Sequence, residues 1–245
     1  MLELKDISKR YGKKVALHSF SYSFDKGIYA LLGPNGAGKS TLMNITAGVI
    51  QRSGGQIFLN GKNIAKQNAQ YKAAFGYMPQ QQALINTFSP VQFLGYIAGL
   101  KGLSKREADE QIPALLKKVE LFDNSREKIG GFSGGMKQRL LFSQSLLGSP
   151  EIVILDEPTV GLDPRQRVIL RGVIEDYSKE HTVIISTHIV SDVESLAAEV
   201  IMLKNGRIIE SGRCGELLKR SGAPTLESLY MKLFDNGDEN ENDMV

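Results

Sequence analysis

The chain has 245 residues, of which 42% are hydrophobic and 23% are charged. This balance is typical of a globular protein and excludes a disordered, collagen-like or coiled-coil chain. A single cysteine, Cys214, excludes an intramolecular disulfide, and a formal net charge of +3 gives no support to nucleic-acid binding. No run of about 18 apolar residues is present, so we expect no transmembrane helix.

The first 80 residues predict short strands and turns. Runs rich in β-forming residues, such as 28–32 and 56–59, alternate with turns that contain glycine. From about residue 81 to 150 the pattern changes to that of helices, with capping boxes at residues 89–92 and 104–107. Pro113 lies inside the second expected helix and leaves its continuity open.

Three continuous apolar runs follow, at residues 152–155, 182–186 and 200–203. Runs of this length between helical patterns are typical of buried parallel strands. We therefore expect an α/β domain over residues 1–234, with a helical insertion at about 81–150. Residues 235–245 carry five acidic side chains and no basic one, which predicts a disordered tail.

The strongest motif follows the expected strand at 28–32. Residues 33–41 fit the pattern G-x-x-x-x-G-K-[ST] and lead into an expected helix, which is the context of a phosphate-binding loop. Its glycines let backbone N–H groups approach phosphate oxygens, Lys39 supplies a positive charge, and the Ser40 hydroxyl ligates Mg²⁺. The candidate nucleotide-binding residues here are Gly33, Pro34, Asn35, Gly36, Ala37, Gly38, Lys39, Ser40 and Thr41.

Two acidic residues, Asp156 and Glu157, follow the apolar run at 152–155. The carboxyl end of a parallel strand lies at the sheet edge where phosphate ligands bind, so Asp156 is a candidate Mg²⁺ ligand and Glu157 a candidate to polarise the attacking water. An acidic pair alone is equally typical of a solvated strand end. Together with the phosphate loop it predicts a nucleoside triphosphatase.

Residues 132–139 read Phe-Ser-Gly-Gly-Met-Lys-Gln-Arg. This segment resembles the signature sequence of ATP-binding cassette (ABC) proteins, usually written Leu-Ser-Gly-Gly-Gln. Ser133 is expected to cap a helix whose N–H groups at Gly134 and Gly135 point outward. A second phosphate-binding helix terminus is useful if it serves the nucleotide of another chain.

The resemblance extends over residues 1 to about 215 and implies roles for four further residues. By this resemblance Tyr11 stacks on adenine, and Gln80 contacts Mg²⁺ and the attacking water. Asp163 lies in a loop that crosses a dimer interface, and His188 lies near the γ-phosphate. Gln81 and Gln82 follow Gln80, so the choice among the three rests on the preceding residues.

The ABC resemblance also implies a fold and an assembly. The fold is a P-loop NTPase core with a mostly parallel sheet, an N-terminal antiparallel β part and an inserted α-helical subdomain. Two such subunits form a head-to-tail dimer that hydrolyses ATP with Mg²⁺. They dock on separate transmembrane permease subunits at the cytoplasmic face of the cell membrane.

Residues 73–100 form a stretch of 28 residues without a charged side chain. The residues alone leave two explanations open: a helix buried in its own domain, or an apolar surface for a partner. In the ABC family the coupling helix of the membrane partner reaches the loop at Gln80, which favours the partner surface. We therefore expect Phe93→Glu or Leu94→Glu to uncouple the ATPase from its partner.

The end of the chain bears on the direction of transport. Residues 225–233 are similar to the closing segment of ATPases from ABC-2 type exporters, and too few residues follow the expected strand at 207–210 for the added domain of sugar importers. Export is therefore expected, with an importer subunit as the main alternative and a regulatory ABC ATPase as a more distant one. A single cassette argues against a translation factor, and the short insertion argues against a coiled-coil DNA-repair ATPase.

Overall fold

The structure, a computed structural model, describes residues 1–64, 69–80, 84–197 and 199–234. The predicted acidic tail at 235–245, and Gln81 and Gln82, lie outside these residues. None of the helices in the described part combines the length and the hydrophobicity that a bilayer span requires.

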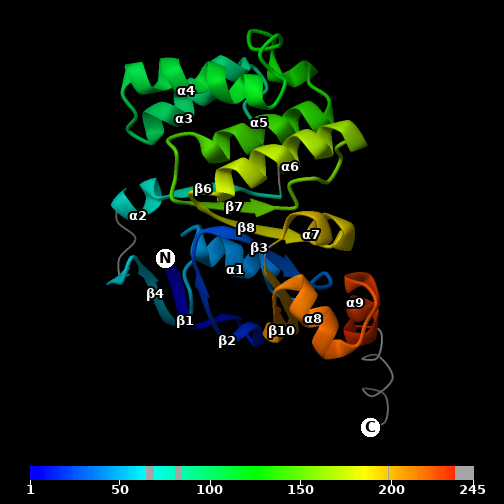
Figure 1. Cartoon of the computed structure of the whole chain (residues 1–245). Helices are drawn as coiled ribbons and strands as arrows, with labels where there is room; N and C mark the ends of the chain where they lie inside the picture. Colours follow the sequence, from blue (N-terminus) through cyan, green and yellow to red (C-terminus); the bar gives the residue numbers. More distant parts are fainter. Residues whose placement is uncertain (65–68, 81–83, 198, 235–245) are drawn as a thin grey trace.

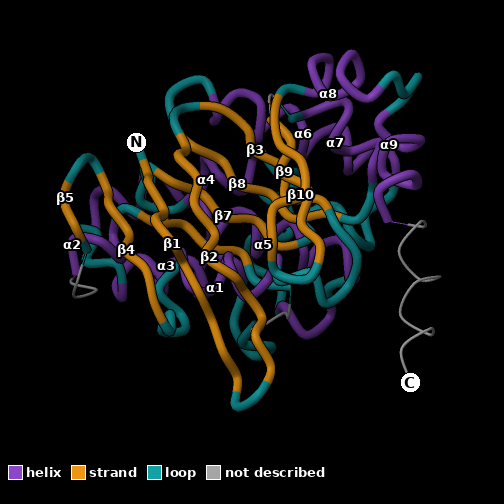
Figure 2. Tube along the Cα trace, turned by 90° about the horizontal axis from the view of Figure 1, so that it is seen from below, coloured by secondary structure: helices purple, strands orange, loops and turns teal. Residues whose placement is uncertain are grey.

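Two sheets form the framework of the molecule (Figure 2). The first is antiparallel, in the order β2-β1-β4-β5. Its strands are β1 (Leu2–Tyr11), β2 (Lys14–Phe24), β4 (Gly54–Leu59) and β5 (Lys62–Asn63). Alternating residues of β1, namely Leu2 and Leu4, are buried, because successive side chains of a strand point to opposite faces of the sheet.

The second sheet has six strands in the order β10-β9-β3-β8-β7-β6, and only β10 runs antiparallel to its neighbour. Its strands are β3 (Gly27–Leu32), β6 (Phe75–Met78), β7 (Ile152–Asp156), β8 (Thr182–Thr187), β9 (Glu199–Lys204) and β10 (Arg207–Gly212). All residues of β7 and β8 are buried, as a parallel sheet covered on both faces requires. The predicted fold class is confirmed.

The two faces of this sheet have different coverings (Figure 1). On one face α1 (Lys39–Thr46) and the antiparallel sheet pack against Ile152 and Ile154 of β7. On the other face α5 (Gly134–Leu146) and α6 (Pro164–Ser178) pack against Val153 and Leu155 of the same strand. A third hydrophobic cluster joins α7 (Val190–Leu196), α8 (Cys214–Ser221) and α9 (Leu226–Phe234) to β3 and β9.

The chain between β6 and β7 is helical, after the short α2 (Ala69–Ala73) that precedes β6. It contains α3 (Pro90–Leu100), α4 (Lys105–Lys118), the 3₁₀ turn η1 (Ile129–Gly131) and α5. Both predicted capping boxes are present, at Ser89 and Ser104. The helix α4 continues through Pro113, which settles the question that the sequence left open.

The charge-free stretch divides between the core and the surface. Phe93 and Leu94 are 3% and 0% exposed. They belong to the hydrophobic cluster under α5, which also contains Leu140, Leu141 and Phe142 of that helix, so the expectation that they form a partner surface was wrong. They lie on the inner face of α3, whereas Val91, Tyr96 and Leu100 lie on its outer face and are 42%, 50% and 68% exposed. The periodicity of the helix separates the two sets.

Candidate nucleotide site

An open cavity of about 230 Å³ lies where β3 and β7 end. The phosphate loop and α1 form one wall, and residues of β1, β2 and β7, with Gln80 after β6 and Glu157 after β7, complete the cavity. The lining residues are Tyr11, Lys14, Ala16, Asn35, Gly36, Ala37, Gly38, Lys39, Ser40, Thr41, Gln80, Asp156 and Glu157. This position is where doubly wound α/β proteins bind their ligands.

The phosphate loop needs glycine at two positions for steric reasons. At Gly33 a Cβ atom would lie 2.3 Å from the carbonyl oxygen of Leu203. Gly38 has φ +105°, and a Cβ atom there would lie 2.7 Å from the carbonyl oxygen of Ala16. The loop is therefore packed closely against β2 and β9 and arrives at the first residue of α1 with its backbone amides uncovered by side chains.

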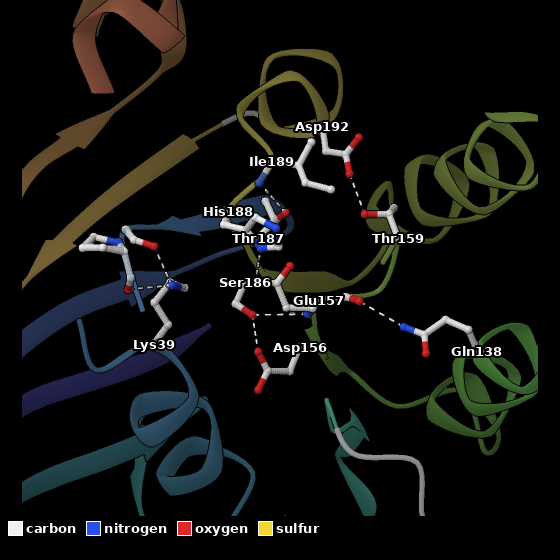
Figure 3. Close-up of polar contacts among 12 residues, drawn as sticks. Lys39, Gln138, Asp156, Glu157, Thr159, Ser186, Thr187, His188, Ile189 and Asp192 are labelled. Carbon is white, nitrogen blue, oxygen red and sulfur yellow. Dashed lines mark hydrogen bonds and ion pairs between the residues drawn. The ribbon is translucent and has the colours of Figure 1, made fainter. Parts of the chain in front are cut away.

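Lys39 is folded back onto this loop. Its Nζ donates to the carbonyl oxygens of Gly33, at 2.6 Å, and Pro34, at 3.0 Å, as drawn in Figure 3. Burial lowers the pKa of the ammonium group, and the nearby carboxylates of Glu157 and Asp156 oppose this effect. A cation held by neutral carbonyls gains from contact with an anion that enters the cavity.

Asp156 and Glu157 stand at the end of β7, beside β8 (Figure 3). The hydroxyl group of Ser186 donates to Asp156 Oδ1, and the backbone N–H of Glu157 donates to the carbonyl oxygen of Ser186 at 3.1 Å. Glu157 has φ +54°, a left-handed conformation that costs energy for a residue with a side chain. The contacts with β8 help to hold this strained turn.

The two carboxylate oxygens of Glu157 have different surroundings. Oε1 lies 2.9 Å from Nδ1 of His188, while Oε2 is buried and has no hydrogen-bond partner within the described residues. Glu157 is 9% exposed and His188 is 56% exposed at their side chains. A buried acceptor without a partner is costly, so Oε2 is set up to accept a hydrogen bond from a ligand or water.

Tyr11 and Gln80 lie at the rim of the cavity. Tyr11 is 48% exposed, and the ammonium group of Lys9 lies 4.9 Å from its ring centroid. Gln80 is exposed, just after β6, and lines the cavity. Both positions leave the side chain accessible to a ligand.

Ser133, Gly134, Gly135 and Asp163 form a separate group that does not border this cavity. Ser133 caps α5 and accepts a hydrogen bond from the backbone N–H of Met136 at 3.2 Å, as the sequence predicts. Gly134 is exposed, and a Cβ atom there would meet open space. Asp163 caps α6 and accepts a hydrogen bond from the backbone N–H of Gln166 at 2.8 Å.

Sequence reasoning missed several polar side chains around the site. Lys14 lines the cavity, and Ser186 binds Asp156 although it ends an apolar run. Gln138 of α5 donates to the carbonyl oxygens of Glu157, at 3.0 Å, and Pro158, at 3.3 Å. A polar residue at the end of an apolar run was the available signal for Ser186, whereas Gln138 carries no comparable local signal.

The donor set of the cavity suits Mg²⁺. No group of three or more His, Cys, Asp or Glu that could hold a metal ion occurs among the described residues. Mg²⁺ needs no such group, because it binds through one or two carboxylates or hydroxyls together with substrate phosphates. Ser40, Asp156 and Gln80 offer oxygen donors on the same cavity, so the residues fit this ion.

Comparison with known proteins places the chain in a family. A family model described as "ABC transporter" matches residues 17–160. The linearmycin resistance ATP-binding protein LnrL of Bacillus subtilis (strain 168) is 37% identical over 231 residues, which cover 94% of this chain and 74% of LnrL. The Nod factor export ATP-binding protein I of Cupriavidus pinatubonensis is 31% identical over 220 residues, which cover 89% of this chain and 68% of that protein.

A solved structure agrees with these matches. It is described as the ATP binding subunit of an ABC transporter, is 31% identical, and superposes with a TM-score of 0.87 over 95% of this chain and 99% of that one. The family match covers more than half of the described chain and includes both the phosphate loop and Glu157. The chain therefore belongs to the ABC transporter family, as one of its ATP-binding, ATP-hydrolysing subunits.

Proposed function

We propose that two of these subunits form a head-to-tail dimer with ATP between the phosphate loop of one and residues 133–135 of the other. One observation carries the proposal. The N-terminus of α5, capped by Ser133, is exposed at Ser133 and Gly134 and buried at Gly135, and it does not border the cavity at Lys39; a helix N-terminus of this kind favours an anion. Each chain thus carries two half-sites on separate surfaces, the cavity at the phosphate loop and the N-terminus of α5. A second chain completes the cavity by placing its own α5 N-terminus over it.

Hydrolysis in this site uses the contacts already present around Glu157. Lys39 exchanges the carbonyls of Gly33 and Pro34 for oxygens of the β- and γ-phosphates. Glu157 Oε2 accepts a hydrogen bond from the attacking water, while His188 holds Oε1. The water oxygen bonds to the γ-phosphorus, the bond from that phosphorus to the β–γ bridging oxygen breaks, and ADP leaves while the phosphate product keeps the two protons of the water. Mg²⁺ on Ser40, Asp156 and Gln80 would neutralise phosphate charge.

The remaining predicted residues bind the ends of the nucleotide. Adenine stacks on the exposed ring of Tyr11, on the face that Lys9 leaves open. Ser133, Gly134 and Gly135 contact the γ-phosphate from the second subunit, and the loop before Asp163 crosses between the subunits. The closed dimer therefore depends on ATP, and its hydrolysis releases the subunits.

We further propose that the protein works at the cytoplasmic face of the membrane, powering export through separate permease subunits. The similarity of residues 225–233, which include all of α9 except its last residue, Phe234, to the ends of ABC-2 type exporter ATPases supports export. One relative, the Nod factor export ATP-binding protein I, carries export in its name and supports the same direction.

The outer face of α3 is our candidate permease surface. Gly95 and Gly99 lie one turn apart on this helix, and a Cβ atom at either would meet open space. Glycine inside a helix costs about 1 kcal/mol relative to alanine, and no contact of the chain itself requires it here. Close approach of another helix would use both glycines, beside the exposed Val91, Tyr96 and Leu100.

The substitution Glu157→Gln tests the proposed function. Without a carboxylate to orient water, we expect hydrolysis to fall by about 100-fold or more, while ATP binding persists. ATP should then convert the purified variant from monomer to dimer in size-exclusion chromatography with light scattering. The tagged variant, purified from native membranes with ATP, should carry a permease subunit.

The alternatives give different results in the same experiment. A variant that hydrolyses ATP at the wild-type rate would remove Glu157 from the proposed role. Recovery together with a substrate-binding protein would make the complex an importer. Recovery of soluble proteins alone would contradict the permease proposal.

A further inference from the structure

Asp192 is a buried carboxylate of α7 that lies away from the nucleotide cavity. It is 3% exposed. The hydroxyl group of Thr159 donates to its Oδ2, and the guanidinium group of Arg171 donates to its Oδ1. A buried charge is costly unless it is paired and hydrogen-bonded, and Asp192 satisfies both requirements with partners from two other segments.

The hydrogen bond between Thr159 and Asp192 is a second contact between the two segments that carry Glu157 and His188 (Figure 3). Thr159 lies two residues after Glu157, and Asp192 lies four residues after His188. The two segments therefore meet twice: once through Glu157 Oε1 and His188 Nδ1 at 2.9 Å, and once through Thr159 and Asp192. Two contacts between short segments fix their relative position better than one.

Arg171 brings a third segment to the same carboxylate. It lies on α6, two turns after Asp163 caps that helix. The loop before Asp163 is the one that the proposed function places at the dimer interface. Asp192 is thus hydrogen-bonded to the segment at 157–159, through Thr159, and to α6, through Arg171. Asp192 itself lies on α7, the helix that follows His188.

Glu157 needs such support because of its own conformation. Its φ of +54° is strained, and the backbone around it is held by Gln138 from α5 on the other side. The direction of the carboxylate therefore depends on contacts made by its neighbours. A shift of about 1 Å at a reacting group can reduce a rate by about 100-fold.

We propose that Asp192 is a positioning residue for ATP hydrolysis, acting through Thr159 and Arg171 to keep the Glu157 carboxylate in place against His188. This inference rests on the proposed role of Glu157. In the proposed dimer Asp192 does not contact the nucleotide. The carboxylate acts by holding α6, α7 and the segment at 157–159 together.

The variant Thr159→Val tests this role, because valine keeps the volume and removes only the hydroxyl group. We expect kcat to fall by about 10- to 100-fold, with the ATP KM and the affinity for a fluorescent ATP analogue changed by less than about twofold. Thr159→Ser retains the hydroxyl group and should keep kcat within about threefold of the wild type. Arg171→Met, which removes the other partner of Asp192, should lower kcat in the same selective way.

Two comparisons separate positioning from a general loss of structure. In the Glu157→Gln background Thr159→Val should cause no further loss of residual single-turnover hydrolysis, because the group it positions is gone. The control Thr182→Val removes another buried threonine hydroxyl, which donates to Asp25 O at 2.7 Å, and should leave kcat unchanged. Circular dichroism and melting temperature monitor the fold of each variant.

Several results would overturn the inference. They are a wild-type kcat for Thr159→Val, an equal loss for Thr159→Ser, or a further loss in the Glu157→Gln background. If Thr159→Val fails to fold, Arg171→Met decides by the same kcat and KM measurements. The proposed function itself fails on a different result, namely wild-type hydrolysis by Glu157→Gln alone.

Discussion

Lys101 shows how a single side chain can connect two helices at an energetic cost. It caps the C-terminal end of α3, and its ammonium group donates to the carbonyl oxygen of Leu147, at the end of α5, at 2.5 Å. Burial lowers the pKa of this ammonium group to about 8. The contact joins two helix ends that both carry partial negative charge, which is where a cation is favoured.

This lowered pKa predicts a pH dependence of stability. Between about pH 8 and 10.4 the unfolded state holds a proton on Lys101 that the folded state has lost, so the free energy of unfolding rises with pH. One pKa unit corresponds to about 1.4 kcal/mol. The wild type should therefore gain up to about 3 kcal/mol relative to Lys101→Met over this range. Urea unfolding of both proteins from pH 7.5 to 10 measures the difference, and parallel stability curves would contradict the prediction.

Among the elements, α4 is stable despite a proline in its interior. Pro113 has no N–H group to donate to the preceding turn and crowds its carbonyl, yet the helix runs from Lys105 to Lys118. Tertiary packing explains this, because Ile112, Leu115 and Leu116 are buried in the cluster under α5. The capping box at Ser104 and two lysines in the last turn stabilise the helix further.

Replacing this proline should stabilise the protein. For Pro113→Ala we expect the free energy of unfolding to rise by about 1–3 kcal/mol, the gain in helix propensity less the greater entropy of the unfolded chain. Pro164→Ala is the matched control, since Pro164 is the exposed first residue of α6, where a missing N–H costs nothing. Urea unfolding of the two variants checks the difference. Equal effects, or a loss at Pro113, would refute it.

The elements also show what the sequence alone could predict. Strands β7 and β8 and the caps at Ser89, Ser104 and Ser133 follow from local patterns, and the structure confirms them. The inner and outer faces of α3 could not be assigned, since an uncharged helix gives no polar face to read. Asp192 was missed for a related reason: an acidic residue in a helix reads as solvated until its partners from other segments are known.

At the scale of the whole molecule, one hydrophobic cluster connects α3 to the nucleotide cavity. Phe93 and Leu94 of α3 share this cluster with residues of α5 and with Val153 and Leu155 of β7. The next residue of β7 is Asp156, which lines the cavity. Packed interiors transmit displacement because they have little free volume. A partner that binds the outer face of α3 and displaces this helix would thus also displace the end of β7, where the catalytic residues lie.

The variant Tyr96→Glu tests this surface in the assembled transporter. Tyr96 is half-exposed on the outer face of α3, so a charge there should leave the fold and the ATPase rate of the isolated subunit within about twofold. It should abolish recovery of the permease with the tagged subunit, because a charge in an apolar helix interface is desolvated without a partner. Ile209→Glu, at an exposed apolar position on β10 far from α3 in Figure 1, is the control and should keep the permease. Equal recovery with both variants would place the permease contact elsewhere, whereas loss with Tyr96→Glu alone would assign it to α3.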